Sequence, residues 1–167
     1  MFDILDTALQ SAHALVQTQL SGGGTTVTSA LVIDDRVLVT HVGDSRAYLI
    51  RGEKVEQLTH DHSMVEAMKD RNGGVEPAGV PPRSLLYRAV GVEGPLDVDH
   101  YTAWLEPGSF LLLCSDGLWD SISEGEIANI IGSSESPQVA CDRLVESSLE
   151  ANGSDNTTAI LIHNLLD

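Results

Sequence analysis

Three aspartates stand where the sequence turns between extended segments. Asp44 follows Gly43 in a short turn, Asp116 follows an apolar run and precedes Gly117, and Asp155 precedes the last β-branched segment. Carboxylates held by rigid neighbours at strand ends offer the oxygen ligands and fixed geometry that Mg²⁺ and Mn²⁺ require. Aspartate is also a common turn residue beside glycine, serine and asparagine. Divalent-metal binding is therefore one hypothesis for these acids, and plain turn formation is the other.

Other polar residues offer weaker chemistry. The histidines show no regular metal-ligand spacing; they are His13, His41, His60, His62, His100 and His163. We interpret His41 as a packed strand residue rather than an acid–base group. Ser63 and Ser115 lack convincing histidine and aspartate partners for a nucleophilic triad. For Arg46 and Arg88 we expect ion pairs rather than contacts to phosphate.

Composition restricts the classes of function. The 167 residues include 9 Lys and Arg against 25 Asp and Glu, a formal charge of −16. Such a surface attracts cations and repels nucleic acid and anionic lipid, so we expect neither nucleic acid nor membrane as a partner. Two cysteines make no disulfide framework, and the sequence shows neither a membrane span nor a signal peptide. These features predict a cytoplasmic protein.

Hydrophobic periodicity and turn residues predict a single α+β domain over residues 1–167. Helices are expected at 2–20 and 62–72 and after the capping residues Ser123 and Ser136; strands are expected at 26–33, 37–42, 46–51, 54–58, 85–90, 98–105, 110–114 and 157–163. The first four strands are interpreted as one antiparallel meander. Residues 73–83 are rich in glycine and proline, which predicts a mobile loop.

Six short patterns in a fixed order carry a resemblance that covers essentially the whole chain. They are Gly24-Thr25-Thr26, Gly43-Asp44-Ser45-Arg46, Leu58-Thr59-His60-Asp61-His62-Ser63, Arg88-Ala89-Val90-Gly91, Leu113-Cys114-Ser115-Asp116-Gly117-Leu118-Trp119-Asp120 and Ser154-Asp155-Asn156-Thr157-Thr158. Together they resemble the metal-dependent protein serine/threonine phosphatases of the protein phosphatase 2C type, in their compact bacterial form. The Ser-Asp-Gly-Leu-Trp-Asp and Gly-Asp-Ser-Arg blocks are the most specific.

This resemblance implies both a fold and a reaction. The fold is a four-layer α-β-β-α sandwich, in which two antiparallel sheets are flanked by helices. In the family, a pair of Mg²⁺ or Mn²⁺ ions activates a water that attacks the phosphorus of phosphoserine or phosphothreonine in a phosphoprotein substrate. By position, Asp116 and Asp155 match ligands of one ion of the pair. Asp44 matches the acid that, with Asp116, holds a third, weaker ion.

The sequence also departs from the family pattern at its start. The Asn-x-Asp element and the Asp-Gly-x-Gly-Gly strand, which supply further metal ligands, do not precede the first helix, nor does the phosphate-gripping arginine. We therefore expect an N-terminally truncated domain with impaired hydrolysis. An exposed sheet edge would then favour a homodimer. The alternative is a non-catalytic phosphatase-like module that binds a partner protein.

Overall fold

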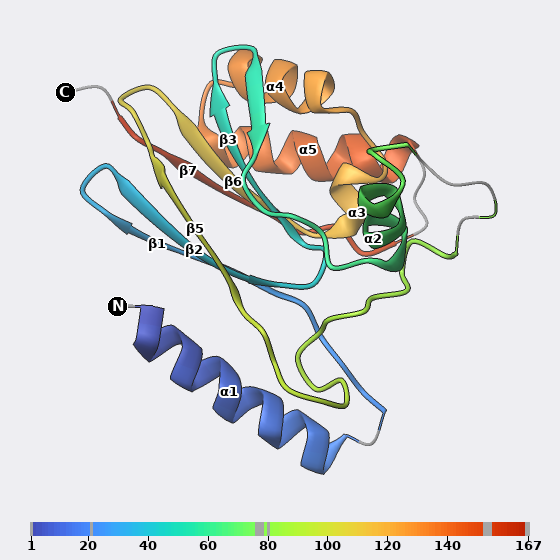
Figure 1. The fold of residues 1–167 in the computed structure, drawn as a ribbon. Helices are drawn as coiled ribbons and strands as arrows, with labels where there is room; N and C mark the ends of the chain where they lie inside the picture. The colour runs from blue at the N-terminus through green and yellow to red at the C-terminus, as the bar shows by residue number, and fades with distance from the viewer. Residues whose placement is uncertain (1, 21, 76–78, 80, 152–154, 166–167) are drawn as a thin grey trace. The chain divides into compact units, whose positions relative to one another are not determined.

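The computed structural model describes all residues except 1, 21, 76–78, 80, 152–154 and 166–167. Its helices are α1 (Phe2–Gln19), α2 (Met64–Arg71), α3 (Asp116–Trp119), α4 (Glu124–Ser133) and α5 (Pro137–Ala151). Its strands are β1 (Val27–Ile33), β2 (Arg36–Val42), β3 (Arg46–Arg51), β4 (Lys54–Gln57), β5 (Asp99–Trp104), β6 (Phe110–Cys114) and β7 (Ala159–His163). Figure 1 shows these elements along the chain. Helices and two antiparallel sheets occur together, so the predicted α+β class is confirmed.

The strands form a sheet of order β1-β2-β5 and a sheet of order β4-β3-β6-β7. The predicted single meander is therefore wrong, because β2 and β3 belong to different sheets. The turn at Gly43 carries the chain from one sheet to the other instead of closing a hairpin. Gly43 has φ +114°, a conformation that favours glycine. In the second sheet β3 pairs with both β4 and β6, and β6 pairs with β7, all antiparallel.

Two further predictions need correction. Residues 85–90 form no strand, because their backbone groups are divided among several partners instead of forming one ladder. Leu85 O accepts from the Met64 N–H, the Tyr87 N–H donates to His62 O, and Val90 bridges to Thr25. The short helix α3 was not predicted, since the apolar run before it extends as β6. The predicted loop at 73–83 lies partly outside the described residues.

Serine caps fix the start of three helices as predicted or nearly so. The Ser63 Oγ accepts from the Glu66 N–H (3.2 Å), so α2 begins one residue after it. The Ser123 Oγ accepts from the Glu126 N–H (3.3 Å) at α4. The Ser136 Oγ does the same for the Val139 N–H (3.3 Å) at α5. These bonds satisfy backbone donors that a helix start otherwise leaves unpaired.

The chain divides into two compact units. The first unit is Met1–Ser29, Thr40–Asp44 and His60–His100; the second unit is Ala30–Val39, Ser45–Thr59 and Tyr101–Asp167. The first has a small apolar cluster of Val42, Val90 and Leu96, against which Leu9 and Val16 of α1 pack. Among the described residues, no helix is long and apolar enough to cross a membrane.

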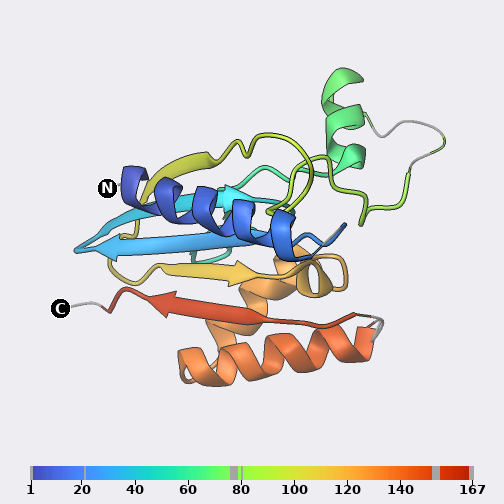
Figure 2. The same cartoon turned by 90° about the horizontal axis from the view of Figure 1, so that it is seen from below.

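The second unit has an apolar core on each face of the sheet β4-β3-β6-β7. Alternate residues of β3 and β6 point to opposite faces, as the two-residue period of a strand requires. On one face Tyr48 and Leu112 pack with residues of α4 and α5, such as Ile127 and Leu144. Figure 2 shows α5 running alongside β7. The opposite face packs on Val37 and Val39 of β2 and on Leu105.

Candidate metal centre

The end of β6 and the start of β7 are joined by three hydrogen bonds in the second unit. The Ser115 N–H donates to Thr158 O (3.1 Å), and the Thr158 N–H donates to the Ser115 Oγ (3.0 Å). The Ser115 hydroxyl donates in turn to Asn156 O (3.2 Å). These bonds continue the antiparallel pairing of β6 and β7 beyond the last paired residues. Asp116, which follows Ser115, and Asp155, which precedes Asn156, are therefore held at one end of the sheet.

Gly117 permits the close approach of these two segments. A Cβ added at Gly117 would lie 2.6 Å from Asn156 O and 2.8 Å from the Thr157 Oγ1. Both atoms belong to a segment fixed by the sheet, so they cannot move aside cheaply. The glycine in the Ser-Asp-Gly pattern is therefore a packing requirement, and it explains why Asp116 and Asp155 are brought together.

Asp155 lies close enough to Asp116 to affect the ionisation of the Asp116 carboxyl. Burial raises the pKa of the Asp116 carboxyl, and the neighbouring Asp155 carboxylate raises it further. The Gly117 N–H opposes this effect by donating to the Asp116 Oδ1 (3.0 Å). The Asp155 Oδ1 accepts from the Asn156 N–H (2.7 Å). Two repelling carboxylates on a fixed backbone favour a cation between them.

The donor set fits a hard divalent cation. Both groups supply carboxylate oxygen, which Mg²⁺ and Mn²⁺ prefer, and a bound cation would remove the repulsion that raises the Asp116 pKa. Among the described residues, these two acids are not part of a cluster of three or more ligating side chains.

The third predicted acid, Asp44, belongs to the first unit, where it is 6% exposed. The turn before it is fixed by packing and by hydrogen bonds. A Cβ at Gly43 would lie 2.4 Å from the Thr26 Cγ2, so only glycine fits there. The backbone N–H of Gly43 donates to the His62 ring at Nδ1 (3.0 Å), and the backbone N–H of His62 donates to Gly43 O (2.7 Å). His62 is therefore a positioning residue for the turn that carries Asp44.

The His62 ring is oriented by an acid and an arginine that sequence analysis did not connect with it. Since Nδ1 accepts from Gly43, the ring proton lies on Nε2, which donates to the Asp99 Oδ2 (3.1 Å). Arg88 donates to the Asp99 Oδ1 (2.6 Å), as expected of an ion-paired arginine. Burial works against ionisation of Asp99, but the hydrogen bonds from His62 and Arg88 outweigh it and lower the Asp99 pKa.

His41 has a similar bracing role and is fully buried, as predicted for a packed strand residue. Its Nε2 donates to His60 O (3.0 Å), so its Nδ1 accepts from the Thr28 hydroxyl (2.9 Å). Burial lowers the pKa of His41 to about 4, and the nearby His62 contributes. The ring is therefore neutral near pH 7 and is not available as a general acid.

The sequence patterns pointed to the acids but not to the residues that orient the Asp44 turn. His62 lies inside the Thr-His-Asp-His-Ser pattern, which was the available signal. Asp99 had none, because a lone acid at the start of a strand is common. Arg46 differs from the ion-paired Arg88 in its described contacts. It stacks on Trp119, with its guanidinium carbon 3.6 Å from the ring centroid, and it donates to the Tyr48 hydroxyl (2.8 Å).

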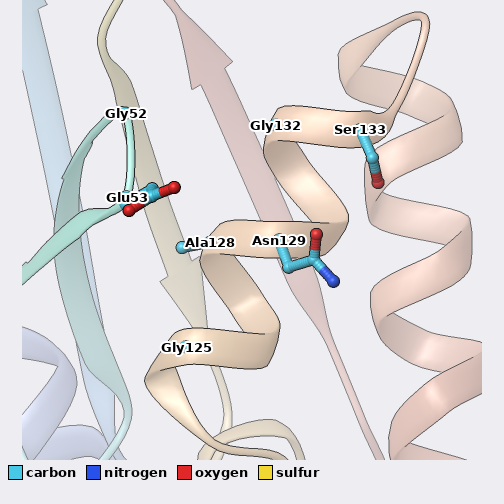
Figure 3. A pocket seen from close by; sticks show the side chains of 7 residues that line it. All are labelled: Gly52, Glu53, Gly125, Ala128, Asn129, Gly132 and Ser133. Carbon is cyan, nitrogen blue, oxygen red and sulfur yellow. The ribbon is translucent and has the colours of Figure 1, made fainter.

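A separate hollow of about 660 Å³ lies between the β3–β4 hairpin and α4. Figure 3 shows its lining, which consists of Gly52, Glu53, Gly125, Ala128, Asn129, Gly132 and Ser133. None of the candidate metal ligands lines it. Small residues along α4 create this space, and its few polar groups do not define a ligand.

Known proteins support the resemblance found in the sequence. The profile described as protein phosphatase 2C matches residues 3–67 and 97–157. The chain is 34% identical over 157 residues to the serine/threonine phosphatase stp of Listeria innocua, covering 92% of this chain and 62% of that protein. The S. agalactiae serine/threonine phosphatase superposes with a TM-score of 0.88 at 25% identity, over 98% of this chain and 72% of that one. The catalytic domain of the phosphatase PstP, in complex with 2 manganese ions, superposes with a TM-score of 0.75 at 31% identity, over 92% and 65%.

The chain belongs to the protein phosphatase 2C family. It spans about three fifths of the length of the Listeria relative, for which 62% is covered. The motifs that carried the resemblance lie mainly in the matched segments, and the two close acids, Asp116 and Asp155, lie within the second of these.

Proposed function

We propose that this chain is a metal-dependent protein serine/threonine phosphatase domain that hydrolyses phosphoserine and phosphothreonine, with low activity when alone. One observation carries the proposal most directly. The Ser115–Gly117 segment is locked against Asn156 and Thr158, so that Asp116 and Asp155 lie close together and the Asp116 pKa is raised. Family membership connects this pair of acids with phosphate ester hydrolysis.

Asp116 and Asp155 would hold Mg²⁺ or Mn²⁺, and Asp44 is proposed as a ligand of a further, weaker ion. Bound divalent cations supply positive charge that polarises phosphoryl oxygens and activates water. The chain's own residues contribute position. Ser115 orients Asp116 through the β7 segment, and His62 holds the turn that carries Asp44.

The small ligand set motivates the proposal of low activity. Two close carboxylates form a weaker cation site than a larger set, and a two-metal reaction depends on both ions for charge and orientation. We therefore propose that Mn²⁺ or Mg²⁺ binds with low affinity and that turnover falls below the rates usual for enzymes, about 1–1000 per second.

Phosphate release from a phosphothreonine peptide, measured with Mn²⁺ and with Mg²⁺, tests this function. We expect slow, metal-dependent release that Asp116→Asn abolishes, whereas Asp142→Asn on the exposed face of α5 leaves it unchanged. Turnover at ordinary enzyme rates would contradict the impaired state. Metal binding without any phosphate release would favour the alternative, a non-catalytic phosphatase-like module that binds a partner protein.

We also propose self-association through β7. Among the described residues β7 pairs with β6 alone, and Ile160 on it is 54% exposed. An edge strand presents unpaired backbone groups, which a second copy can pair in antiparallel fashion. Measurement of mass in solution should show a dimer that Ile160→Lys dissociates. A monomer at all concentrations would contradict this proposal.

The proposed substrate is a phosphoprotein, and the proposed compartment is the cytoplasm. Both cysteines are free thiols, with Cys114 buried and Cys141 partly buried, which suits a reducing compartment. The formal net charge of −16 disfavours nucleic acid and anionic membranes as partners.

A further inference from the structure

A second set of metal-ligating side chains lies in the first unit. The ligand atoms of His60, Glu66 and Asp70 all lie within 4.8 Å of one another. It is the one group of three or more such residues among the part of the chain that the structure describes. The set differs from the Asp116 pair because it contains an imidazole nitrogen. Imidazole favours a borderline metal ion such as Zn²⁺ over Mg²⁺.

Local structure places these three side chains. Glu66 and Asp70 are four residues apart on α2, so they lie on the same helix face, one turn apart. The Ser63 cap fixes the first turn of that helix. His60 precedes the helix, and its carbonyl accepts from the buried His41 ring (3.0 Å), which fixes the backbone from which the His60 ring projects.

One existing contact already brings two of the ligand atoms to coordination range, and a Glu66 oxygen lies within 4.8 Å of both. The His60 Nε2 lies 2.9 Å from the Asp70 Oδ2. In a tetrahedral zinc site, with metal–ligand bonds of about 2.0–2.1 Å, neighbouring ligand atoms lie roughly 3.3 Å apart. The three side chains are partly exposed, at 45% for His60, 22% for Glu66 and 56% for Asp70, so an ion can reach them from solvent.

Among the contacts described for Glu66, Lys69 competes with an ion. The Lys69 ammonium lies 3.1 Å from the Glu66 Oε1 and 3.3 Å from the Oε2, and it must release at least one oxygen for an ion to bind. The contact is a partly exposed pair within one helix, a type that contributes little. Lys69 therefore weakens the site without blocking it.

We propose that His60, Glu66 and Asp70 form a binding site for a divalent transition-metal ion of the Zn²⁺ type. The site is distinct from the Asp116–Asp155 pair. Three protein ligands leave a fourth position for water or an outside ligand. A bound ion would link α2 to the segment that precedes it, because His60 lies outside the helix and the two acids lie within it. The site would therefore stabilise the first unit.

Titration calorimetry of the whole chain with ZnCl₂ tests the site, and thermal unfolding with and without zinc supplies a second readout. We expect one zinc equivalent that binds more tightly than any zinc at the Asp116–Asp155 pair, and His60→Ala should remove it. Glu66→Gln and Asp70→Asn should each weaken it by more than about tenfold. Lys69→Met should strengthen it by up to about fivefold, the strength of an exposed ion pair. Zinc should raise the unfolding temperature of the wild type but not of His60→Ala.

The chain offers a matched control in His100 and Asp6. The His100 Nε2 lies 2.8 Å from the Asp6 Oδ1, with 30% and 35% side-chain exposure, but no third ligating side chain joins this pair among the residues that the structure describes. His100→Ala should therefore leave zinc binding intact. Zinc binding that is unchanged in His60→Ala would overturn the proposal. Binding lost in His60→Ala but unaffected by both Glu66→Gln and Asp70→Asn would also overturn it, since a lone histidine would then suffice.

Discussion

The two units of the chain are stabilised by different physical means. The second unit has apolar cores on both faces of one sheet, built from fully buried residues such as Tyr48, Leu112 and Leu144. The first unit has one small apolar cluster, and much of its interior is polar. Seven of the buried polar residues belong to it: His13, Thr40, His41, Asp44, Asp61, His62 and Ser63.

Histidines replace part of the apolar core in the first unit. Each of the three buried rings accepts a hydrogen bond at Nδ1 and donates from Nε2. His13 accepts from the Gly91 N–H (2.9 Å) and donates to Gly94 O (3.0 Å), so it ties α1 to the chain after residue 90. His41 and His62 tie strand β2 and the turn after it to the segment around His60. We therefore expect the stability of the second unit to depend on the volume of its buried apolar side chains. The stability of the first unit should depend on the protonation state of its buried histidines.

The largest expected effect comes from the core of the second unit. Leu144→Ala removes a fully buried side chain from α5 and should destabilise the protein by about 2–5 kcal/mol. The matched control is Leu149→Ala on the same helix, where the side chain is 52% exposed and the change should cost less than about 0.5 kcal/mol. Chemical denaturation measures both. Similar costs for the two variants would contradict the proposed core.

The first unit should respond to pH through His41. Its pKa is about 4 in the folded protein against about 6.5 for an unperturbed histidine, so the unfolded chain binds more protons between these values. Stability from this group is fully present above about pH 6.5 and is lost as the pH falls towards 4, by about 3 kcal/mol in total.

A titration of unfolding free energy from pH 7 to pH 4 tests this expectation. His41→Gln should reduce the slope of unfolding free energy against pH by the contribution of about one proton. Leu149→Ala should retain the full slope. If the slope of unfolding free energy against pH were unchanged in His41→Gln, other groups would control the acid sensitivity. That result would contradict the claim that buried histidines stabilise the first unit.

Two glycines of the second unit distinguish the effect of close packing on stability from the effect of helix propensity. Gly117→Ala would place a Cβ 2.6 Å from Asn156 O and should cost about 1–3 kcal/mol. It should also weaken Mn²⁺ binding, because Asp116 and Asp155 would be pushed apart. Gly125→Ala on α4 meets nothing within 4 Å and should stabilise the protein by about 0.5–1 kcal/mol. Equal effects in denaturation would contradict the close approach.

The smallest expected difference lies between two helix caps. Ser123 is exposed at α4, and Ser123→Ala should cost about 1 kcal/mol. Ser63 is 6% exposed at α2, so Ser63→Ala leaves the partly buried Glu66 amide without its acceptor and should cost more. Denaturation curves of the two variants measure this difference. A larger cost at Ser123 would argue against a polar interior in the first unit.

The difference between the apolar second unit and the more polar first unit also explains how much of the fold the sequence could predict. A continuous apolar run predicted β6, and the serine caps with apolar residues at helical spacing predicted where α4 and α5 begin, because burial in an apolar core leaves a signal that is visible in the chain. The first unit was harder. Residues 85–90 have the composition of a strand, but their backbone bonds go to Met64, His62 and Thr25. Such partners are distant in sequence and leave no periodic trace.

The candidate site shows the same limit. Asp116 and Asp155 were identified because each lies beside small residues in a pattern shared with a family. The hydrogen bonds that hold them join Ser115 to Thr158 and Asn156, across 43 and 41 residues of sequence. Contacts this distant in sequence could be found only in the structure. Asp99, which orients His62, had no local signal at all.

Titration calorimetry with Mn²⁺ on the wild type, Asp116→Asn, Asp155→Asn and Asp142→Asn tests the central claim most directly. The account predicts weak binding by the wild type, loss of that binding in both Asp116→Asn and Asp155→Asn, and full retention in Asp142→Asn, which removes an equal charge from the exposed face of α5. Unchanged Mn²⁺ affinity in Asp116→Asn and Asp155→Asn would contradict the proposed metal centre.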